Sequence, residues 1–330
     1  MTRGQRYLAG LVLVQLVLIA AVFWPRGGAA VNSGPLLQNF QADEVVGFVI
    51  HSSDGSQVHL SRLGTGWLLP DAGSFPVDET KVAPFLDKLA AVNTSRLVTR
   101  TSASQSRLKV APDNYERKVE LELNDGSKLT VYVGSSEGSH ATHIRLDGED
   151  AVYLTGELAA ADAGSSPQNW IDTTYLALGV DQINTLQVEN ANGSLSFQKD
   201  ADGNWSQAGL APEADFDTGN FTSALGRLAS LQMLQPLGTE EKPEYNMSQP
   251  TATLTLTSQA EGSDPQTTTL VVGAHQSDPD GYVVKSKSSP YYVSVAPFNL
   301  DSFISATAET FVLPPSTPTV LPGGTPPAAP

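Results

Sequence analysis

An internal duplication constrains the fold more than any other feature of the sequence, because two copies of one unit have to pack in the same way. Residues of the first half recur in the second at a constant offset of 138. The matching pairs are Asp43–Asp181, Val45–Ile183, Phe48–Leu186, Ile50–Val188, Gly55–Gly193, Ser56–Ser194 and Trp67–Trp205. We therefore predict two tandem units, residues 40–178 and 179–313.

The match continues after a one-residue shift, at an offset of 139. These pairs are Asp78–Asp217, Val82–Phe221, Leu86–Leu225, Leu89–Leu228, Ala90–Ala229, Val92–Leu231, Val131–Leu270, Val133–Val272, Gly134–Gly273 and Tyr153–Tyr292. One segment departs from the constant offset. The apolar residues Val58 and Leu60 of the first copy correspond to Leu195 and Phe197 of the second, which lie one position out of step with the offset of 138. The two hairpins that carry these residues are therefore expected to differ at their turns.

Each unit begins with a predicted hairpin and continues with a helix. Strands at 45–51 and 183–189 run into the turns Asp54-Gly55 and Asn192-Gly193, whose residues favour a tight turn. Apolar residues at helical spacing predict helices over 80–92 and 218–231, the first capped by Thr80.

Alternating strands follow at 118–123 and 251–257, with three more short strands after each. The two tryptophans, Trp67 and Trp205, are expected in the cores. The pattern predicts an α+β fold: two tandem repeats, each an antiparallel β-sheet with one main packed helix, preceded by a single transmembrane helix.

The transmembrane helix is predicted over Tyr7–Trp24, within an anchor at residues 1–26. This apolar run spans roughly 27 Å, close to the hydrocarbon core of a bilayer. Arg3 and Arg6 place the N-terminus in the cytoplasm and the body outside a cell membrane, in single-pass topology. The alternative is a cleaved signal peptide, for which Gly28-Ala29-Ala30 offers a cleavage site. A buried core helix is disfavoured because the run has no polar face.

The flanks differ in composition from the body. Residues 27–39 read as a polar spacer, and residues 314–330 as a disordered proline-rich tail. The tail either has no role or contacts a wall polymer or a proline-binding partner. The formal charge of −16 disfavours nucleic acid as a partner, and the absence of cysteine excludes thiol chemistry.

No catalytic, cofactor-binding or metal-binding residue emerges from the pattern. In a strand, His140 and His143 point to opposite faces, whereas His51 and His59 flank the first hairpin. No third ligand is spaced to complete a metal site with either pair. Four aspartates recur in both units and are interpreted as caps or turn residues. They are Asp43, Asp78, Asp181 and Asp217.

The ordered motifs resemble a bacterial family called domain of unknown function 4340. They are DEVVGFVIHSSDGSQVHL from Asp43, GTGWLL, FPVDETKVAPFLDKLAAV, KLTVYVGSSEGSHATHIRLDGEDAVYLT, NWIDTTYL, and Tyr245-Asn246-Met247 with Pro250. The resemblance covers about residues 40–313. It implies a membrane-anchored extracytoplasmic protein of unknown biochemical role, some relatives of which are encoded beside ABC-2-type export systems.

We therefore expect a non-enzymatic anchored protein without a cofactor. Its partners would be the lipid bilayer, through Tyr7–Trp24, and a multispanning ABC-2-type permease or envelope complex. The alternative is an extracytoplasmic ligand-binding or envelope-scaffold protein with a groove between the two units. A hydrolase is the third reading, and it requires acidic residues and histidines clustered in a pocket.

Overall fold

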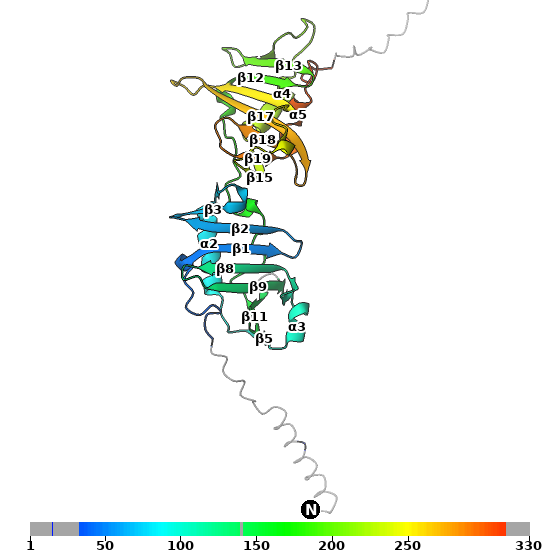
Figure 1. The fold of residues 1–330 in the computed structure, drawn as a ribbon. Helices are drawn as coiled ribbons and strands as arrows, with labels where there is room; N and C mark the ends of the chain where they lie inside the picture. The colour runs from blue at the N-terminus through cyan, green and yellow to red at the C-terminus, as the bar shows by residue number, and fades with distance from the viewer. Residues whose placement is uncertain (1–14, 16–32, 139–140, 315–330) are drawn as a thin grey trace, which may run out of the picture. The chain divides into compact units, whose positions relative to one another are not determined.

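The computed structural model describes residues 33–138 and 141–314, together with residue 15 (Figure 1). Two large antiparallel sheets dominate it, with a third of two strands. The first sheet has the order β4-β3-β2-β1-β8-β9-β10-β11-β5. Its strands are β1 (Val45–Ser52), β2 (Gln57–Leu63), β3 (Gly66–Leu69), β4 (Phe75–Pro76), β5 (Leu97–Thr99), β8 (Arg117–Leu123), β9 (Lys128–Ser136), β10 (Thr142–Leu146) and β11 (Val152–Thr155).

The second sheet has the order β14-β13-β12-β16-β17-β18-β19-β15. Its strands are β12 (Ile183–Asn190), β13 (Gly193–Lys199), β14 (Trp205–Gln207), β15 (Met233–Gly238), β16 (Ala252–Ser258), β17 (Gln266–Ser277), β18 (Asp280–Ser286) and β19 (Tyr292–Val295). Except for the edge strand β4, strands at matching sequence positions occupy the same place in both sheets. The repeated sequence thus produces a repeated strand order.

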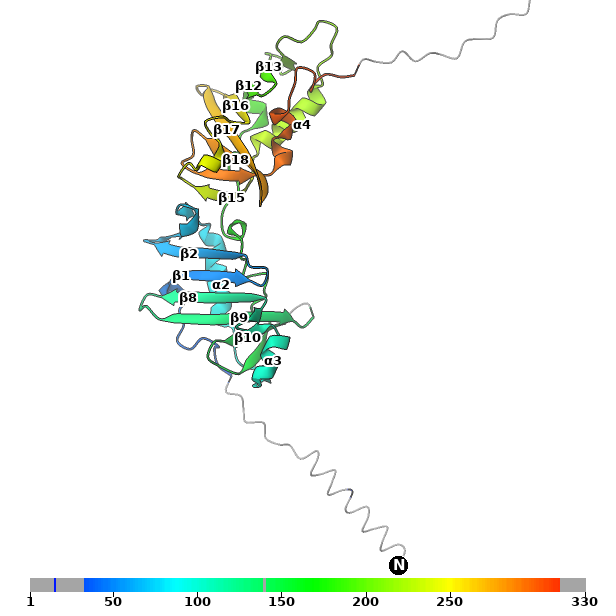
Figure 2. The same ribbon diagram turned by 45° about the vertical axis from the view of Figure 1, so that its right-hand side comes forward.

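Within residues 33–138 and 141–314, the helices are few and short. They are α2 (Glu79–Ala91), α3 (Ser102–Arg107), α4 (Thr218–Ala229) and α5 (Asp301–Ile304). Figure 2 shows α2 along one face of the first sheet and α4 along one face of the second. The 3-10 turns are η1 (Ala42–Glu44), η2 (Pro70–Ala72), η3 (Pro167–Asn169), η4 (Val180–Gln182), η5 (Pro243–Tyr245) and η6 (Pro297–Asn299). The two-stranded sheet pairs β6 (Val110–Ala111) with β7 (Asn114–Tyr115).

The predicted fold class, α+β with a leading transmembrane helix, is wrong. Sheet predominates in the described part of the chain, because its longest helices have only 13 and 12 residues, whereas the two large sheets have nine and eight strands. Short strands such as β4 and β5 carry no alternation and were not visible in the pattern. Among the described residues, no helix is long and apolar enough to cross a membrane. Apart from Gln15, the predicted segment Tyr7–Trp24 lies outside the described residues, as does nearly all of the predicted tail.

The chain divides into two compact units whose bounds do not follow the sheets. One contains Ile50–Gly55, Ala83–Ala163 and the described residues up to Val45. The other contains Val46–Val49, Ser56–Val82 and the chain from Gly164 to the end of the described residues. Strands β2, β3 and β4 and the whole second sheet therefore belong to the second compact unit.

Aromatic rings from α4, the second sheet and the segment after α5 form the centre of a core. The Phe221 ring of α4 lies 4.6 Å from that of Phe197, 5.0 Å from that of Trp205 and 5.4 Å from that of Phe311, between centroids. Asp217 caps this helix, its side chain accepting from the Asn220 N–H. Trp205 is 7% exposed, as is Trp67, so the expectation of core tryptophans is confirmed.

The first helix is capped by a residue other than the one predicted. The Asp78 carboxylate accepts hydrogen bonds from the Thr80 backbone N–H (3.0 Å) and hydroxyl (2.6 Å). Thr80 lies inside α2, so the prediction of Thr80 as the cap is wrong. A short carboxylate one residue before the helix satisfies donors that the helix itself leaves free.

The two amino-terminal hairpins differ, as the phase slip predicted. Strand β1 ends at Ser52 and β2 begins at Gln57, whereas β12 ends at Asn190 and β13 begins at Gly193. The second turn is thus shorter by two residues. The buried residues also differ in phase: Val58 and Leu60 of β2 are buried, whereas Phe197 of β13 is buried, one position out of step with Leu60 at the offset of 138.

Candidate functional site

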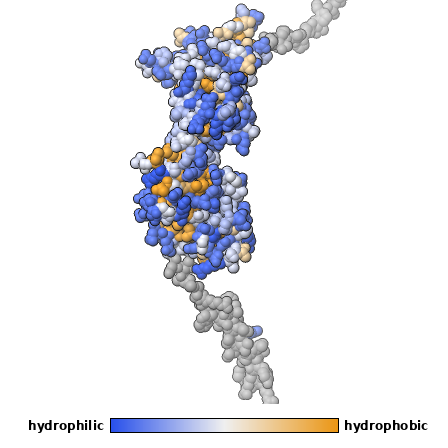
Figure 3. All heavy atoms as spheres, viewed as in Figure 1, coloured by the Kyte–Doolittle hydropathy of each residue, from blue (hydrophilic) through white to orange (hydrophobic). Residues whose placement is uncertain are grey.

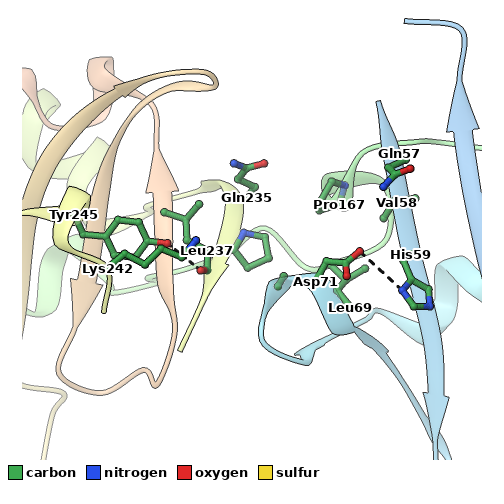
Figure 4. A pocket seen from close by; sticks show the side chains of 12 residues that line it. Gln57, Val58, His59, Leu69, Asp71, Pro167, Gln235, Leu237, Lys242 and Tyr245 are labelled. Carbon is green, nitrogen blue, oxygen red and sulfur yellow. Dashed lines mark hydrogen bonds and ion pairs between the residues drawn. The ribbon is translucent and has the colours of Figure 1, made fainter. Parts of the chain in front are cut away.

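A pocket of about 250 Å³ is the candidate site (Figure 4). All of its lining residues belong to the second compact unit. They come from β2, the end of β3, η2, η3, β15 and η5. The lining residues are Gln57, Val58, His59, Leu69, Asp71, Ala72, Pro167, Gln235, Pro236, Leu237, Lys242 and Tyr245.

Glycines set the backbone that shapes this pocket. Gly73 ends η2 with a φ of +68°, a conformation that other residues rarely adopt. A Cβ at Gly73 would lie 2.9 Å from the Cα of Gly238, at the end of β15. The absence of a side chain therefore lets η2 and β15 approach closely, which brings Asp71 and Gln235 into one pocket.

One wall of the pocket carries an acid and a histidine. The His59 Nδ1 lies 3.9 Å from the Asp71 Oδ2, and both side chains are open to solvent. The side chains of His59 and Asp71 are 39% and 74% exposed, so their attraction is weak. Both groups therefore remain available to a bound molecule. Figure 4 shows them on the same side of the pocket.

The opposite wall carries a lysine beside a buried tyrosine. The Tyr245 hydroxyl donates to the Leu237 carbonyl oxygen at 3.1 Å, and the residue is 2% exposed. The Lys242 Nζ lies 5.6 Å from the centre of the Tyr245 ring. Behind it, the Tyr292 ring lies 5.4 Å from that of Tyr245. Burial and the Glu241 carboxylate raise the pKa of Tyr292 above its ordinary value of 10.0.

This arrangement offers complementary contacts to a polar molecule. The Lys242 ammonium group and the His59 imidazole can donate hydrogen bonds to a carboxylate of a bound molecule. The Asp71 carboxylate can accept a hydrogen bond from a donor of that molecule. Val58, Leu69 and Pro236 supply apolar lining. The only hydroxyl in the lining, that of Tyr245, donates its proton to a backbone carbonyl.

The other histidines lie apart from this pocket. His51 pairs with Glu120 at 2.8 Å, and His275 pairs with Asp280 at 2.8 Å. His143 is buried, with its Nδ1 2.7 Å from the Ser135 carbonyl oxygen. His140 lies outside the described residues. Among those that are described, no group of three potential metal ligands occurs.

The recurring aspartates lie at matching places in both sheets. Asp78 and Asp217 cap α2 and α4, which confirms the interpretation as caps for these two. Asp43 and Asp181 lie in the 3-10 turns η1 and η4, just before β1 and β12. None of the four lines the pocket of Figure 4.

Sequence reasoning did not identify Asp71, Lys242 or Tyr245 as site residues. Asp71 and Lys242 are far apart in the chain, and no local pattern links them. Tyr245 appeared only as part of a family motif. The sequence feature that relates to this pocket is the pair of glycines Gly73 and Gly238, where the backbones of η2 and β15 approach closely.

The fold is a pair of duplicated antiparallel sheets, and the candidate site is a small pocket lined by both polar and apolar side chains. The sequence profile described as Domain of unknown function (DUF4340) matches residues 67–250, which is more than half of the chain. The chain therefore belongs to this family, as the motifs indicated. Comparisons with curated proteins and with solved structures gave no match.

Proposed function

We propose that the protein is a non-enzymatic binding protein whose pocket in Figure 4 holds a short polar segment of a partner protein. The observation that carries this proposal is the placement of charge. Lys242 stands on one wall and Asp71 on the other, beside apolar lining. A peptide segment presents both carbonyl acceptors and N–H donors, which these groups complement.

The volume of the pocket supports the same proposal. About 250 Å³ is below the range typical of drug-sized ligands, and it suits a few residues of a peptide. The exposed polar side chains of His59 and Asp71 are typical of an interface rim, where such groups favour selectivity more than affinity.

The finer proposal is an accessory subunit of an ABC-2-type transporter or envelope complex. It rests on the resemblance of the chain to its family, and the partner would be a multispanning permease. An extracytoplasmic location belongs to the same proposal. Because a shared fold does not by itself establish a function, the partner has to be identified by experiment.

A photo-crosslinking residue at Gln235 tests the proposal directly, in cells that express the full chain. We expect a crosslink to a multispanning membrane protein from this position. The same group at Asp125, in the exposed turn between β8 and β9, serves as the control and should give none. The variant Asp71→Lys should weaken the crosslink from Gln235 without unfolding the protein, because Asp71 is 74% exposed. Equal products from both positions, or none from Gln235, would contradict the proposal.

A further inference from the structure

One basic segment stands out in a chain that is otherwise acidic. Residues 88–112 contain five basic side chains and no Asp or Glu, whereas the whole chain has 35 acidic side chains and a formal charge of −16. The segment runs from the end of α2 through β5 and α3 to β6. It lies entirely in the first compact unit, within Ala83–Ala163. Figure 3 shows mainly hydrophilic residues over β5 and α3.

Three arginines of this segment have no acidic partner. Two of the five basic side chains, Lys88 and Lys109, form ion pairs with carboxylates of the same unit. Arg96, Arg100 and Arg107, in contrast, are exposed. Within the described part of the chain, none of these three pairs with a carboxylate. Their positive charge is therefore left open to a partner outside the fold.

An edge strand presents two of these arginines together. Strand β5 ends the first sheet, and Arg96 and Arg100 flank it. Side chains alternate in direction along a strand, so Arg96, Val98 and Arg100 point to one side, and all three are exposed. Helix α3 follows, and Arg107 is its last residue. Charge on an edge strand also discourages pairing with another chain, but that role requires no arginine on α3.

The first described residues run beside this segment. The Thr94 N–H donates to the Gly34 carbonyl oxygen at 2.9 Å, and the Gly34 N–H donates to the Thr94 hydroxyl at 3.2 Å. Figures 1 and 2 show α3 at the same end of the unit as the beginning of the described chain. In the sequence, the apolar run Tyr7–Trp24 ends ten residues before Gly34, a stretch that spans at most about 36 Å. A bilayer that binds this run is therefore within reach of the arginines.

We propose that Arg96, Arg100 and Arg107 bind anionic phospholipid headgroups at the surface of a membrane. The proposal rests on the proposed function, which places the protein beside a membrane transporter. A guanidinium donates paired hydrogen bonds to a phosphate, and each basic side chain near an anionic surface strengthens the contact about fivefold. Acidic groups farther than about 8 Å from the surface are largely screened at physiological ionic strength. The formal charge of −16 therefore does not prevent the contact.

A fluorescent label on α3 tests the proposal with the full chain bound to vesicles. Because the chain has no cysteine, Ala103→Cys supplies a single thiol at an exposed position. The vesicles contain phosphatidylcholine alone or mixed with phosphatidylglycerol, and some of the lipid carries a quenching nitroxide on its headgroup. We expect strong quenching only with the anionic lipid, and its loss when NaCl is raised from about 50 mM to about 500 mM. A label at Asn124→Cys, in the exposed turn between β8 and β9, is the control and should respond equally to both lipid mixtures.

Charge variants assign the contact to the arginines. For Arg96→Gln/Arg100→Gln we expect the contact with anionic lipid to weaken more than about tenfold. Lys128→Gln/Lys287→Gln removes the same charge at exposed lysines outside the segment, so it is the matched control and should leave the contact unchanged. Tm measurements show whether each variant folds. Should the arginine double variant fail to fold, Arg107→Gln should give about a fivefold loss.

Several outcomes overturn the proposal. Equal quenching in both lipid mixtures, or undiminished quenching of the arginine variants, would exclude recognition of anionic headgroups. Energy transfer between labels on two copies, lost in Arg96→Gln/Arg100→Gln, would assign the arginines to an acidic surface of a second copy instead. A full chain that binds neither kind of vesicle would overturn the proposal together with the membrane location. The crosslink from Gln235 tests the partner segment separately, because Gln235 belongs to the other compact unit.

Discussion

Arg145 is a buried cation whose contacts are almost all with backbone carbonyls. It is 3% exposed, its Nε donates to the Val110 oxygen at 2.7 Å, and its Nη1 donates to the Glu149 oxygen at 3.0 Å. The guanidinium lies 4.5 Å from the centre of the Tyr132 ring. Its bond to Val110 connects the two-stranded β6–β7 sheet to strand β10.

We predict that Arg145→Met lowers the free energy of unfolding by about 2–4 kcal/mol. The change leaves buried carbonyls without donors and removes the contact with Tyr132. Urea denaturation measures the loss. Arg107→Met, at an exposed arginine of α3, is the control and should change the value by less than about 0.5 kcal/mol. A loss as small as that of the control would show that water replaces the guanidinium.

Glu120 gives a pH dependence of known sign. Burial raises the pKa of its carboxyl, but hydrogen bonds from His51 and Lys118 outweigh this, so the pKa lies below its ordinary value of 4.5. The carboxylate therefore stabilises the fold above pH 4.5, and the contribution is lost as the pH falls through the lowered pKa. We predict that Glu120→Gln makes the free energy of unfolding less sensitive to acid. Denaturation from about pH 7 to about pH 3 tests this against exposed Glu122→Gln, and identical pH profiles for wild type and Glu120→Gln would contradict it.

At the scale of the elements, one glycine recurs in both sheets for a steric reason. A Cβ at Gly134 of β9 would lie 2.2 Å from the Leu108 carbonyl oxygen. A Cβ at Gly273 of β17 would lie 2.1 Å from the Tyr245 carbonyl oxygen. In each sheet a connecting segment therefore crosses the strand at backbone contact, and only glycine leaves room for it.

We predict that Gly134→Ala and Gly273→Ala each cost about 2–4 kcal/mol of unfolding free energy, since the clash is with backbone. Gly226 of α4 provides the opposite case, because a Cβ there has no atom within 4 Å. Gly226→Ala should stabilise the protein by about 0.5–1 kcal/mol. Thermal and urea unfolding of the three variants checks the sign, and a neutral Gly273→Ala would show that the crossing segment can move.

The elements with a strong local pattern were predictable from the sequence. Val131 and Val133 alternate along β9, and Phe221, Leu225 and Leu228 lie on one side of α4. Strand β5 was not visible because it has only three residues, none of which is fully buried. The pocket of Figure 4 was also not predictable, because His59 and Lys242 meet only through tertiary structure.

At the scale of the whole molecule, charge is the dominant global property. The formal charge of −16 produces self-repulsion in the compact state, which dissolved ions screen. We predict that raising NaCl from about 10 mM to about 200 mM increases the free energy of unfolding by about 1 kcal/mol at neutral pH. Urea denaturation at the two salt concentrations measures it. Potassium glutamate at the same ionic strength separates screening from specific chloride binding, and a decrease with both salts would contradict the prediction.

Because the two sheets share one strand order, comparing them shows which features of the repeated unit can change and which are kept. The two copies keep the order of their sheets and the glycine at each crossing, but their first hairpins differ in length by two residues. The two copies have thus diverged in the length of a turn between strands, whereas the order of neighbouring strands has stayed the same. For protein engineering, the turns at Asp54-Gly55 and Ala191-Asn192 are therefore the places where a foreign loop can be inserted while both sheets keep their pairing.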